Sequence, residues 1–236
     1  MKLSVIIPCF NEEKTISQII NKVDKFNSFS KEIVVVNDCS TDNSKKIIED
    51  ICEKNNLIKL INHSVNQGKG AALRTGIEYA SGDIIIIQDA DLEYNPNDYK
   101  IILDKFNNYK NLAVYGSRVL NKKRYINKNF ISNFRIFANH MLTLFSNFIN
   151  NQNLTDAHTC YKAVRSEVFD KIQLYEQGFS FCPELTTKLS NLKVSIIEVP
   201  INYNGRTFQE GKKIKFSDGF KAILAVIKYK FYSKSI

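Results

Sequence analysis

The sequence predicts an α/β protein with a mostly parallel central sheet. Continuous apolar runs, such as Leu3–Ile7 and Ile84–Ile87, are typical of strands that are buried on both faces. Segments with apolar residues at helical spacing alternate with these runs through the first hundred residues, and this alternation is typical of βαβ units. The 236 residues are 44% hydrophobic and 24% charged, a composition that excludes a disordered or fibrous chain.

The expected elements can be placed in chain order. We expect strands over Leu3–Ile7, Glu32–Val36, Leu57–Ile61, Asp83–Ile87 and Leu112–Tyr115. Three helices between the first four strands are predicted by the apolar stripes Ile16, Ile19, Ile20 and Val23, then Ile47, Ile48 and Ile51, then Ala71, Leu73, Ile77 and Tyr79. Two more helices are expected over Phe130–Ile149 and Phe216–Phe231. Apolar runs are all far shorter than the roughly 18 residues of a membrane-spanning helix, so we expect a cytoplasmic protein.

The formal net charge of +9 is unevenly distributed along the chain. Residues 105–155 carry +8 without any acidic side chain, and residues 211–236 carry +6. This segregation predicts surfaces that meet an anion: phosphate, lipid head groups or nucleic acid. Nucleic acid is the least favoured, because the sequence has no recognised nucleic-acid-binding motif. Five scattered cysteines without a C-x-x-C pair are expected to be reduced thiols.

Polar residues follow each of the first four expected strands. The clusters are 8–13, 37–42, 66–70 and 88–93. Each one alone is also typical of a turn or a helix cap. Because ligands bind outside the carboxyl ends of the strands in such sheets, four clusters at one edge favour a binding site. Within it, Asp38 is placed to accept hydrogen bonds from a base or a ribose. Lys69, between two glycines at a helix N-terminus, suits a nearby anion, although the segment lacks the spacing of a Walker or dinucleotide motif.

The segment Asp89-Ala90-Asp91 predicts a metal site. Residues i and i+2 of an extended segment point the same way, so both carboxylates can face one point. Two adjacent anions repel each other unless a cation lies between them, and hard divalent cations prefer carboxylate oxygens. Mg²⁺ or Mn²⁺ bound there would bridge to a diphosphate, and Glu93 can supply a further oxygen ligand. A solvated acidic turn is the alternative for this motif alone.

Taken together, the motifs resemble family 2 glycosyltransferases. They are Ser4–Glu12, Val36–Asp42, Gly68–Gly76 and Asp89–Glu93, with further matches at Tyr115–Arg118, Thr155-Asp156, Cys160–Lys162 and Gly205–Ile214. Within the family they are most similar to the dolichyl-phosphate mannose synthase and polyprenyl-phosphate glycosyltransferase group. The resemblance implies a GT-A fold and inverting transfer of a hexose from a nucleotide-sugar to a polyprenyl phosphate. It also implies a GT-A domain over 1–210, with a nucleotide-binding half (1–104) and an acceptor half (105–210), followed by a basic amphipathic helix (211–236).

The resemblance also implies roles for individual residues. The nucleoside would be held by Pro8, Phe10, Glu12, Asn37 and Asp38. The metal and diphosphate would be held by Asp89 and Asp91 with Glu93, and donor and acceptor phosphates by Arg118, Arg206 and Lys212. Departures from the family pattern at Asn37, at Glu93 and over 156–162 leave the donor open between GDP-mannose, UDP-glucose and others.

The acceptor decides whether a general base is needed. A lipid phosphate is already anionic and needs only positioning, whereas a glycan hydroxyl must lose its proton. Asp156 or Glu184 could serve as that base, although Glu184 after Pro183 is equally typical of a helix N-terminal acid. His158 fits either a donor to the sugar or a packed loop histidine. A non-catalytic module that keeps the nucleotide pocket is a less favoured alternative.

The last two expected helices carry apolar stripes beside basic residues. The first stripe is Phe134, Phe137, Met141, Leu144, Phe145 and Phe148, and the second is Phe216, Phe220, Ile223, Leu224, Ile227 and Phe231. Core packing explains such stripes in most proteins. Neighbouring lysines and arginines without acidic residues favour instead helices that lie on an anionic membrane surface. Peripheral attachment to the inner face of the cell membrane and a soluble enzyme that reaches a lipid acceptor both stay open, as does the oligomeric state.

Overall fold

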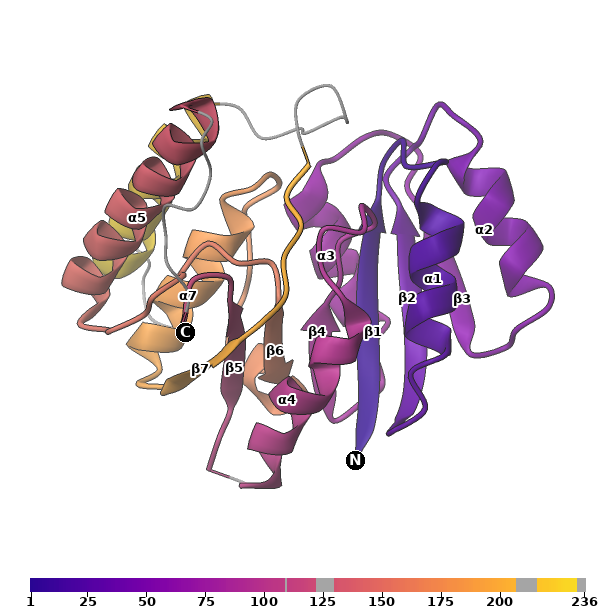
Figure 1. Ribbon diagram of the computed structural model, residues 1–236, viewed down its shortest axis with the longest axis horizontal. Helices are drawn as coiled ribbons and strands as arrows, with labels where there is room; N and C mark the ends of the chain where they lie inside the picture. The colour runs from indigo at the N-terminus through magenta and orange to yellow at the C-terminus, as the bar shows by residue number, and fades with distance from the viewer. Residues whose placement is uncertain (109, 122–129, 207–215, 233–236) are drawn as a thin grey trace.

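The computed structural model describes residues 1–108, 110–121, 130–206 and 216–232, and its centre is one sheet of seven strands (Figure 1). The strands are β1 (Lys2–Cys9), β2 (Ser30–Asn37), β3 (Ile58–Asn62), β4 (Ile84–Ile87), β5 (Ala113–Ser117), β6 (Lys162–Arg165) and β7 (Ile196–Pro200). The helices are α1 (Ile16–Asp24), α2 (Ser44–Cys52), α3 (Lys69–Glu78), α4 (Tyr99–Leu103), α5 (Phe130–Asn150), α6 (Ser166–Phe169), α7 (Phe181–Asn191) and α8 (Phe216–Ile227). Single turns of 3-10 helix flank α4, and a π-helical turn follows α8.

The sheet is mixed and mostly parallel, which confirms the predicted fold class. Its strand order is β3-β2-β1-β4-β6-β5-β7. The first four strands are parallel to one another, and β7 is parallel to β5, whereas β6 runs antiparallel to both of its neighbours. Because parallel strands need crossover connections, α1, α2 and α3 each carry the chain back to the start of the next strand. The carboxyl ends of β1 to β4 therefore meet at one edge.

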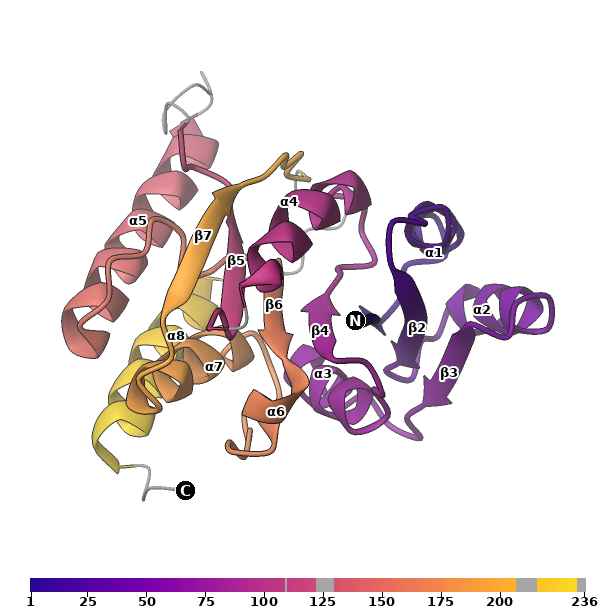
Figure 2. The ribbon, with the colours of Figure 1, turned by 90° about the horizontal axis from the view of Figure 1, so that it is seen from below.

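Helices cover both faces of the sheet, as Figure 2 shows. One face packs against α1, α2 and α4, whose buried side chains include Ile16, Ile48 and Tyr99. The other face packs against α3, α6 and α7, which contribute Leu73 and Leu185. The apolar side chains of β1 alternate between these two cores, so the strand is buried on both faces, as its unbroken apolar run predicts.

Two strands, β6 and β7, have no counterpart among the predicted strands. β6 spans four residues and starts at Lys162, a charged residue that argues against a buried strand unless tertiary structure supplies its partners. β7 ends at Pro200 and has a half-buried pattern. The predicted first four strands are confirmed to within two residues at each end.

Helices α5 and α8 lie side by side beyond β7 (Figures 1 and 2), and several of their apolar side chains are exposed. The buried face of α5 is polar, with Thr143, Ser146 and Asn150, whereas its exposed apolar side chains are Phe137, Met141, Leu144 and Phe148. On α8 and the turn after it, the exposed ones are Phe220, Leu224, Phe231 and Tyr232. Core packing is therefore the wrong interpretation for most of the two stripes. Within the described ranges, each helix is too short or too polar to cross a membrane.

Candidate active site

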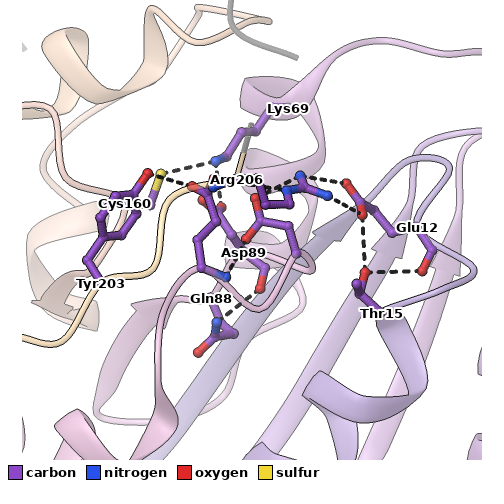
Figure 3. A network of polar contacts seen from close by, with 10 residues as sticks. Glu12, Thr15, Lys69, Gln88, Asp89, Cys160, Tyr203 and Arg206 are labelled. Atoms are coloured by element: carbon purple, nitrogen blue, oxygen red, sulfur yellow. Dashed lines mark hydrogen bonds and ion pairs between the residues drawn. The ribbon is translucent and has the colours of Figure 1, made fainter. Parts of the chain in front are cut away.

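The four polar clusters meet at the carboxyl edge of β1 to β4, as predicted. Asn11, which has a left-handed backbone (φ 51°), accepts a hydrogen bond from the Thr41 amide at 2.8 Å. The Glu12 amide donates to Ser44 Oγ at 2.8 Å and so ties the end of β1 to the start of α2. Pro8 and Phe10 are half-buried beside them. These contacts fix the backbone that follows β1 and leave the Glu12 carboxylate directed toward the centre of the site (Figure 3).

The buried carboxylate of Asp38 holds the loop that precedes α3. Its oxygens accept hydrogen bonds from the amides of Gln67 and Gly68, both at 2.8 Å, and lie 2.8 Å from His63 Nδ1. Asn37 is equally engaged, with Nδ2 donating to Asn62 and Oδ1 accepting from the Ser40 amide. Both residues therefore shape the edge of the site, and a direct contact with a nucleoside stays a prediction.

A backbone carbonyl closes the N-terminus of α3, so the expectation that an anion meets the backbone amides of this helix end is wrong. Gln177 O accepts from the amides of Gly70 at 2.6 Å and Ala71 at 3.2 Å, so these helix donors are not open to an anion. The approach needs glycine, because a Cβ on Gly70 would lie 2.3 Å from Glu176 O and one on Gly68 (φ 93°) would lie 2.6 Å from Gln177 O. The two glycines thus allow the 176–178 loop to pack closely against the start of α3. The group of this segment that can still meet an anion is the Lys69 ammonium.

Lys69 forms a buried ion pair with Asp89 at the end of β4 (Figure 3). Its Nζ lies 2.5 Å from Asp89 Oδ1 and 3.2 Å from Cys160 Sγ. Burial alone would raise the pKa of Asp89, but the Lys69 ammonium and the hydrogen bonds from Cys160 and Lys69 outweigh it and hold that pKa below its usual value. Asp89 is therefore ionised at neutral pH.

Arg206 joins the acidic residues that follow β1 and β4. Its Nη1 and Nη2 atoms donate to the Glu12 carboxylate at 3.0 and 3.2 Å, and Nη2 also donates to Asp91 Oδ2 at 2.9 Å. Its amide donates to Glu93 Oε1 at 2.6 Å, while Tyr203 Oη donates to Glu93 Oε2 at 2.7 Å. Burial and the charges of Asp89 and Glu93 raise the pKa of Asp91 to about 7, despite Arg206 beside it.

The three predicted metal ligands do not gather into one set. In the part of the chain that the structure describes, no three His, Cys, Asp or Glu side chains are arranged to hold a metal ion. Asp89 is paired with Lys69, and Glu93 accepts hydrogen bonds from Tyr203 and the Arg206 amide. The two carboxylates therefore have separate partners. The donor set nevertheless fits a divalent cation, because hard divalent ions prefer carboxylate oxygens and the charges of Asp89 and Glu93, after burial, help to raise the pKa of Asp91.

Arg118 and Asp156 form a second buried ion pair, at the end of β5. Arg118 Nε and Nη2 donate to Asp156 Oδ2 and Oδ1 at 2.7 and 2.8 Å. Burial alone would raise the pKa of Asp156, but Arg118 outweighs it and lowers that pKa, which makes the carboxylate a poor proton acceptor. The Asp156 amide in turn donates to Glu198 at 2.9 Å.

Glu184 is fully buried in the first turn of α7 and holds the preceding loop. Its oxygens accept from the amides of Tyr175 and Glu176, each at 2.8 Å, and from Lys188 Nζ at 2.8 Å. The structure thus corrects the expectation that Glu184 is available as a general base. The ring of His158 has a buried Nε2 without a hydrogen-bond partner among the described residues, and burial lowers its pKa to about 4.

Several residues near the site were missed by sequence reasoning. They are Tyr203, Cys160, Cys182 and Lys162. Tyr203 contacts Glu93 and packs its ring 5.1 Å from the Arg118 guanidinium. No sequence spacing indicated that these four residues lie near the site. The one signal was the match of Cys160–Lys162 to the family pattern. Ala90 is buried between the two aspartates, and Lys212 lies outside the described residues.

Comparisons with known proteins point to one family. The family model described as Glycosyl transferase family 2 matches residues 4–173. A dolichyl-phosphate beta-glucosyltransferase of Trichomonas vaginalis is 27% identical over 96% of this chain and 72% of its own length. A dolichol-phosphate mannosyltransferase of Pyrococcus furiosus is 28% identical, covering 90% of this chain and 59% of its own length. An undecaprenyl-phosphate 4-deoxy-4-formamido-L-arabinose transferase of Proteus mirabilis is 26% identical, with 89% and 62% covered.

Solved structures show the same fold. The glucosyl-3-phosphoglycerate synthase of Mycobacterium tuberculosis, in complex with Mn²⁺, UDP and glucosyl-3-phosphoglycerate, superposes with a TM-score of 0.72. The alignment covers 99% of this chain and 81% of that one, at 17% sequence identity. At this identity the likeness establishes a shared GT-A architecture.

Proposed function

Because this chain belongs to glycosyl transferase family 2, we propose that it transfers a hexose from a nucleotide-sugar to a polyprenyl phosphate with a divalent cation. The observation that carries the proposal is the row of charges at the carboxyl edge of the sheet. Asp89 and Asp91 supply carboxylates there, and Lys69, Arg206 and Arg118 supply cations within hydrogen-bond distance of carboxylates. Such a row suits a diphosphate that is held by a cation and arginines.

Mg²⁺ or Mn²⁺ would be held by Asp89 and Asp91 and would neutralise charge on the departing nucleoside diphosphate. The M. tuberculosis neighbour was crystallised with Mn²⁺ and UDP, which supports this assignment. Lys69 and Arg206 are paired with these carboxylates in the structure. When the cation binds the carboxylates, the ammonium and guanidinium groups would be available to the donor phosphates. Glu12, Asn37 and Asp38 would line the nucleoside side of the same edge.

The engaged state of both candidate bases supports a phosphate acceptor. Asp156 is paired with Arg118, and Glu184 is fully buried with both oxygens engaged, so the predicted bases are not placed to take a proton from a hydroxyl. A lipid phosphate attacks as an anion and needs none. Three relatives are named for dolichyl or undecaprenyl phosphate, which supports the same acceptor class.

The outward face of α5 and α8 is the surface through which the protein would contact such a lipid. Phe148 and Phe220 are 84% and 69% exposed, and Lys221 on α8 and Lys228 in the turn after it are also exposed. Aromatic side chains beside lysines suit the head-group region of an anionic bilayer. A groove of about 400 Å³ between α8 and residues 176–180 has Leu224, Ile227 and Lys228 among its lining residues. We place the enzyme on the membrane surface through this face.

A transfer assay tests the proposal. Purified protein with Mn²⁺ is given labelled UDP-glucose or GDP-mannose, together with undecaprenyl phosphate, dolichyl phosphate or a soluble glycan. We expect label to enter the organic phase as a lipid-linked sugar, and the more active donor identifies the base and the sugar. Label found only on the glycan would contradict the lipid acceptor while leaving the family assignment intact.

A further inference from the structure

A fully buried glutamine lies between the end of β4 and the two carboxylates assigned to the cation. Gln88 is the residue after β4, and its amide extends the ladder to β1 by donating to Ile6 O at 2.9 Å. The next three residues are Asp89, Ala90 and Asp91. A carboxamide without exposed surface needs hydrogen-bond partners inside the protein, because burying it unpaired costs free energy.

Two tyrosine hydroxyls and one backbone carbonyl are the partners of this carboxamide. Tyr99 Oη donates to Gln88 Oε1 at 2.6 Å, and Tyr161 Oη donates to the same oxygen at 2.7 Å. On the other side, Gln88 Nε2 donates to Asp89 O at 3.0 Å (Figure 3). A carbonyl oxygen can only accept, so the nitrogen must face Asp89 and the oxygen must face the two hydroxyls. The three contacts therefore fix one orientation of the glutamine side chain.

The two tyrosines belong to a packed group of four aromatic rings. Tyr99 is the first residue of α4 and Tyr161 directly precedes β6, and both side chains are fully buried with ring centroids 5.6 Å apart. Tyr161 also packs against Tyr94, at 4.6 Å. Tyr94 packs against Tyr203 at 5.1 Å, and the Tyr203 hydroxyl donates to Glu93. The four rings therefore contact the acidic segment after β4 at both of its ends.

We propose that Tyr99 and Tyr161, acting through Gln88, are positioning residues for the divalent cation. The hydrogen bond from Gln88 holds the carbonyl of Asp89, and with it the plane of the peptide that leads into Ala90. That plane sets the directions in which the side chains on either side of Ala90 leave the backbone. Removing a group that orients metal ligands typically costs about 10- to 100-fold in metal affinity. This role rests on the proposed function, which places a cation at the two carboxylates.

The same hydrogen bonds also stabilise the fold, so the variants have to separate stability from metal binding. Gln88→Met is close in size to the original side chain but leaves two buried hydroxyls unpaired. Combined with Tyr99→Phe and Tyr161→Phe, it leaves none of the three side chains with an unpaired polar group. Replacing all partners by apolar groups of similar shape is much less destabilising than removing one. We therefore expect this triple variant to resist urea better than Gln88→Met does.

Manganese binding measures the positioning role. Purified protein is titrated into Mn²⁺ with UDP or GDP present, and the EPR signal of the unbound ion is followed. We expect Gln88→Met to bind Mn²⁺ about tenfold more weakly than the unchanged protein, and the triple variant to bind equally weakly, because both lack the donor to the Asp89 carbonyl. Tyr99→Phe with Tyr161→Phe should also weaken binding, since Gln88 is then no longer held. Gln18→Met, at an exposed position on α1, is the matched control.

Three results would overturn the positioning role. Equal Mn²⁺ binding by Gln88→Met and the unchanged protein is the first, and equal binding by the variant with both phenylalanine substitutions is the second. The third is recovery of Mn²⁺ binding together with stability in the triple variant, which would show that the contacts only fill the core. If the unchanged protein binds no Mn²⁺ with either nucleotide, the metal assignment of the proposed function fails, and this role fails with it.

Discussion

Arg118 donates two parallel hydrogen bonds to Asp156, from Nε to Oδ2 at 2.7 Å and from Nη2 to Oδ1 at 2.8 Å. The pair is nearly inaccessible to solvent, with 17% and 5% of the two side chains exposed. A paired and hydrogen-bonded carboxylate is a weak base, so we expect Asp156 to act by positioning Arg118. The arginine also lies over the Tyr203 ring, which places its guanidinium next to the residues that hold Glu93.

Asp156→Asn distinguishes positioning from base catalysis. We expect the KM for the lipid phosphate to rise and kcat/KM to fall by about 10²-fold, because Arg118 loses its fixed orientation. The shape of the pH profile should stay the same. Initial rates across the pH range measure both. The exposed Asp104→Asn serves as the matched control, and a variant whose rate no longer depends on pH would show that Asp156 is the base after all.

Gly70→Ala should destabilise the fold, because its Cβ would lie 2.3 Å from Glu176 O in a backbone segment that cannot easily move. We expect a loss of about 1–3 kcal/mol in the free energy of unfolding, measured in urea. Gly219→Ala is the matched control: its Cβ would meet only Leu142 Cδ1, at 3.8 Å, on a helix that alanine favours. Equal stability of the two variants would contradict the close approach of the 176–178 loop to α3.

Lys162 should make stability rise with pH in mildly alkaline solution. Burial lowers its pKa from 10.5 to about 8. Between these values the unfolded chain holds a proton that the folded protein has released, so raising the pH favours the folded state. The gain can reach about 3 kcal/mol over the full interval. Urea unfolding from about pH 7.5 to 9.5 measures it, and Lys162→Met should lack it. A variant with the slope of the unchanged protein would assign the effect elsewhere.

Phe148→Glu and Phe220→Glu should weaken membrane binding. These exposed rings lie on α5 and α8, and a carboxylate there both removes apolar contact and repels anionic lipids. Sedimentation with vesicles of phosphatidylglycerol and phosphatidylcholine measures the bound fraction, which we expect to fall by about tenfold. Tyr79→Glu, at an exposed aromatic position at the end of α3, is the control. Binding unaffected by either substitution would show that another surface meets the lipid.

The sheet could be predicted wherever burial is complete. β1 and β4 are buried on both faces, so their sequences are unbroken apolar runs that stand out. β6 is different, because Lys162 is buried by tertiary contacts with Ala157 O and Thr186 that no local pattern reveals. The outward-facing stripe of α5 shows the reverse problem: periodicity predicts a helix with an apolar face, but not which way the face points.

The candidate site was predicted in position and only partly in detail. Strand ends brought Asp38, Asp89 and Asp91 to one edge, as the alternation of strands and helices requires. Their partners could not be predicted, since Arg206 reaches Asp91 from 115 residues away and Cys160 reaches Lys69 from 91. Partner choice depends on three-dimensional proximity, and proximity pairs Asp156 with Arg118 and Glu184 with Lys188.

Metal-dependent transfer in Asp91→Asn tests the central claim most directly. Labelled sugar-lipid is measured against Mn²⁺ concentration for the unchanged protein, for Asp91→Asn and for Asp50→Asn, whose carboxylate is exposed on α2. We predict that the unchanged protein and Asp50→Asn are active only with the cation, and that Asp91→Asn loses at least about 10²-fold in rate at saturating Mn²⁺. Full activity of Asp91→Asn, or transfer that is unaffected by a metal chelator, would contradict the account.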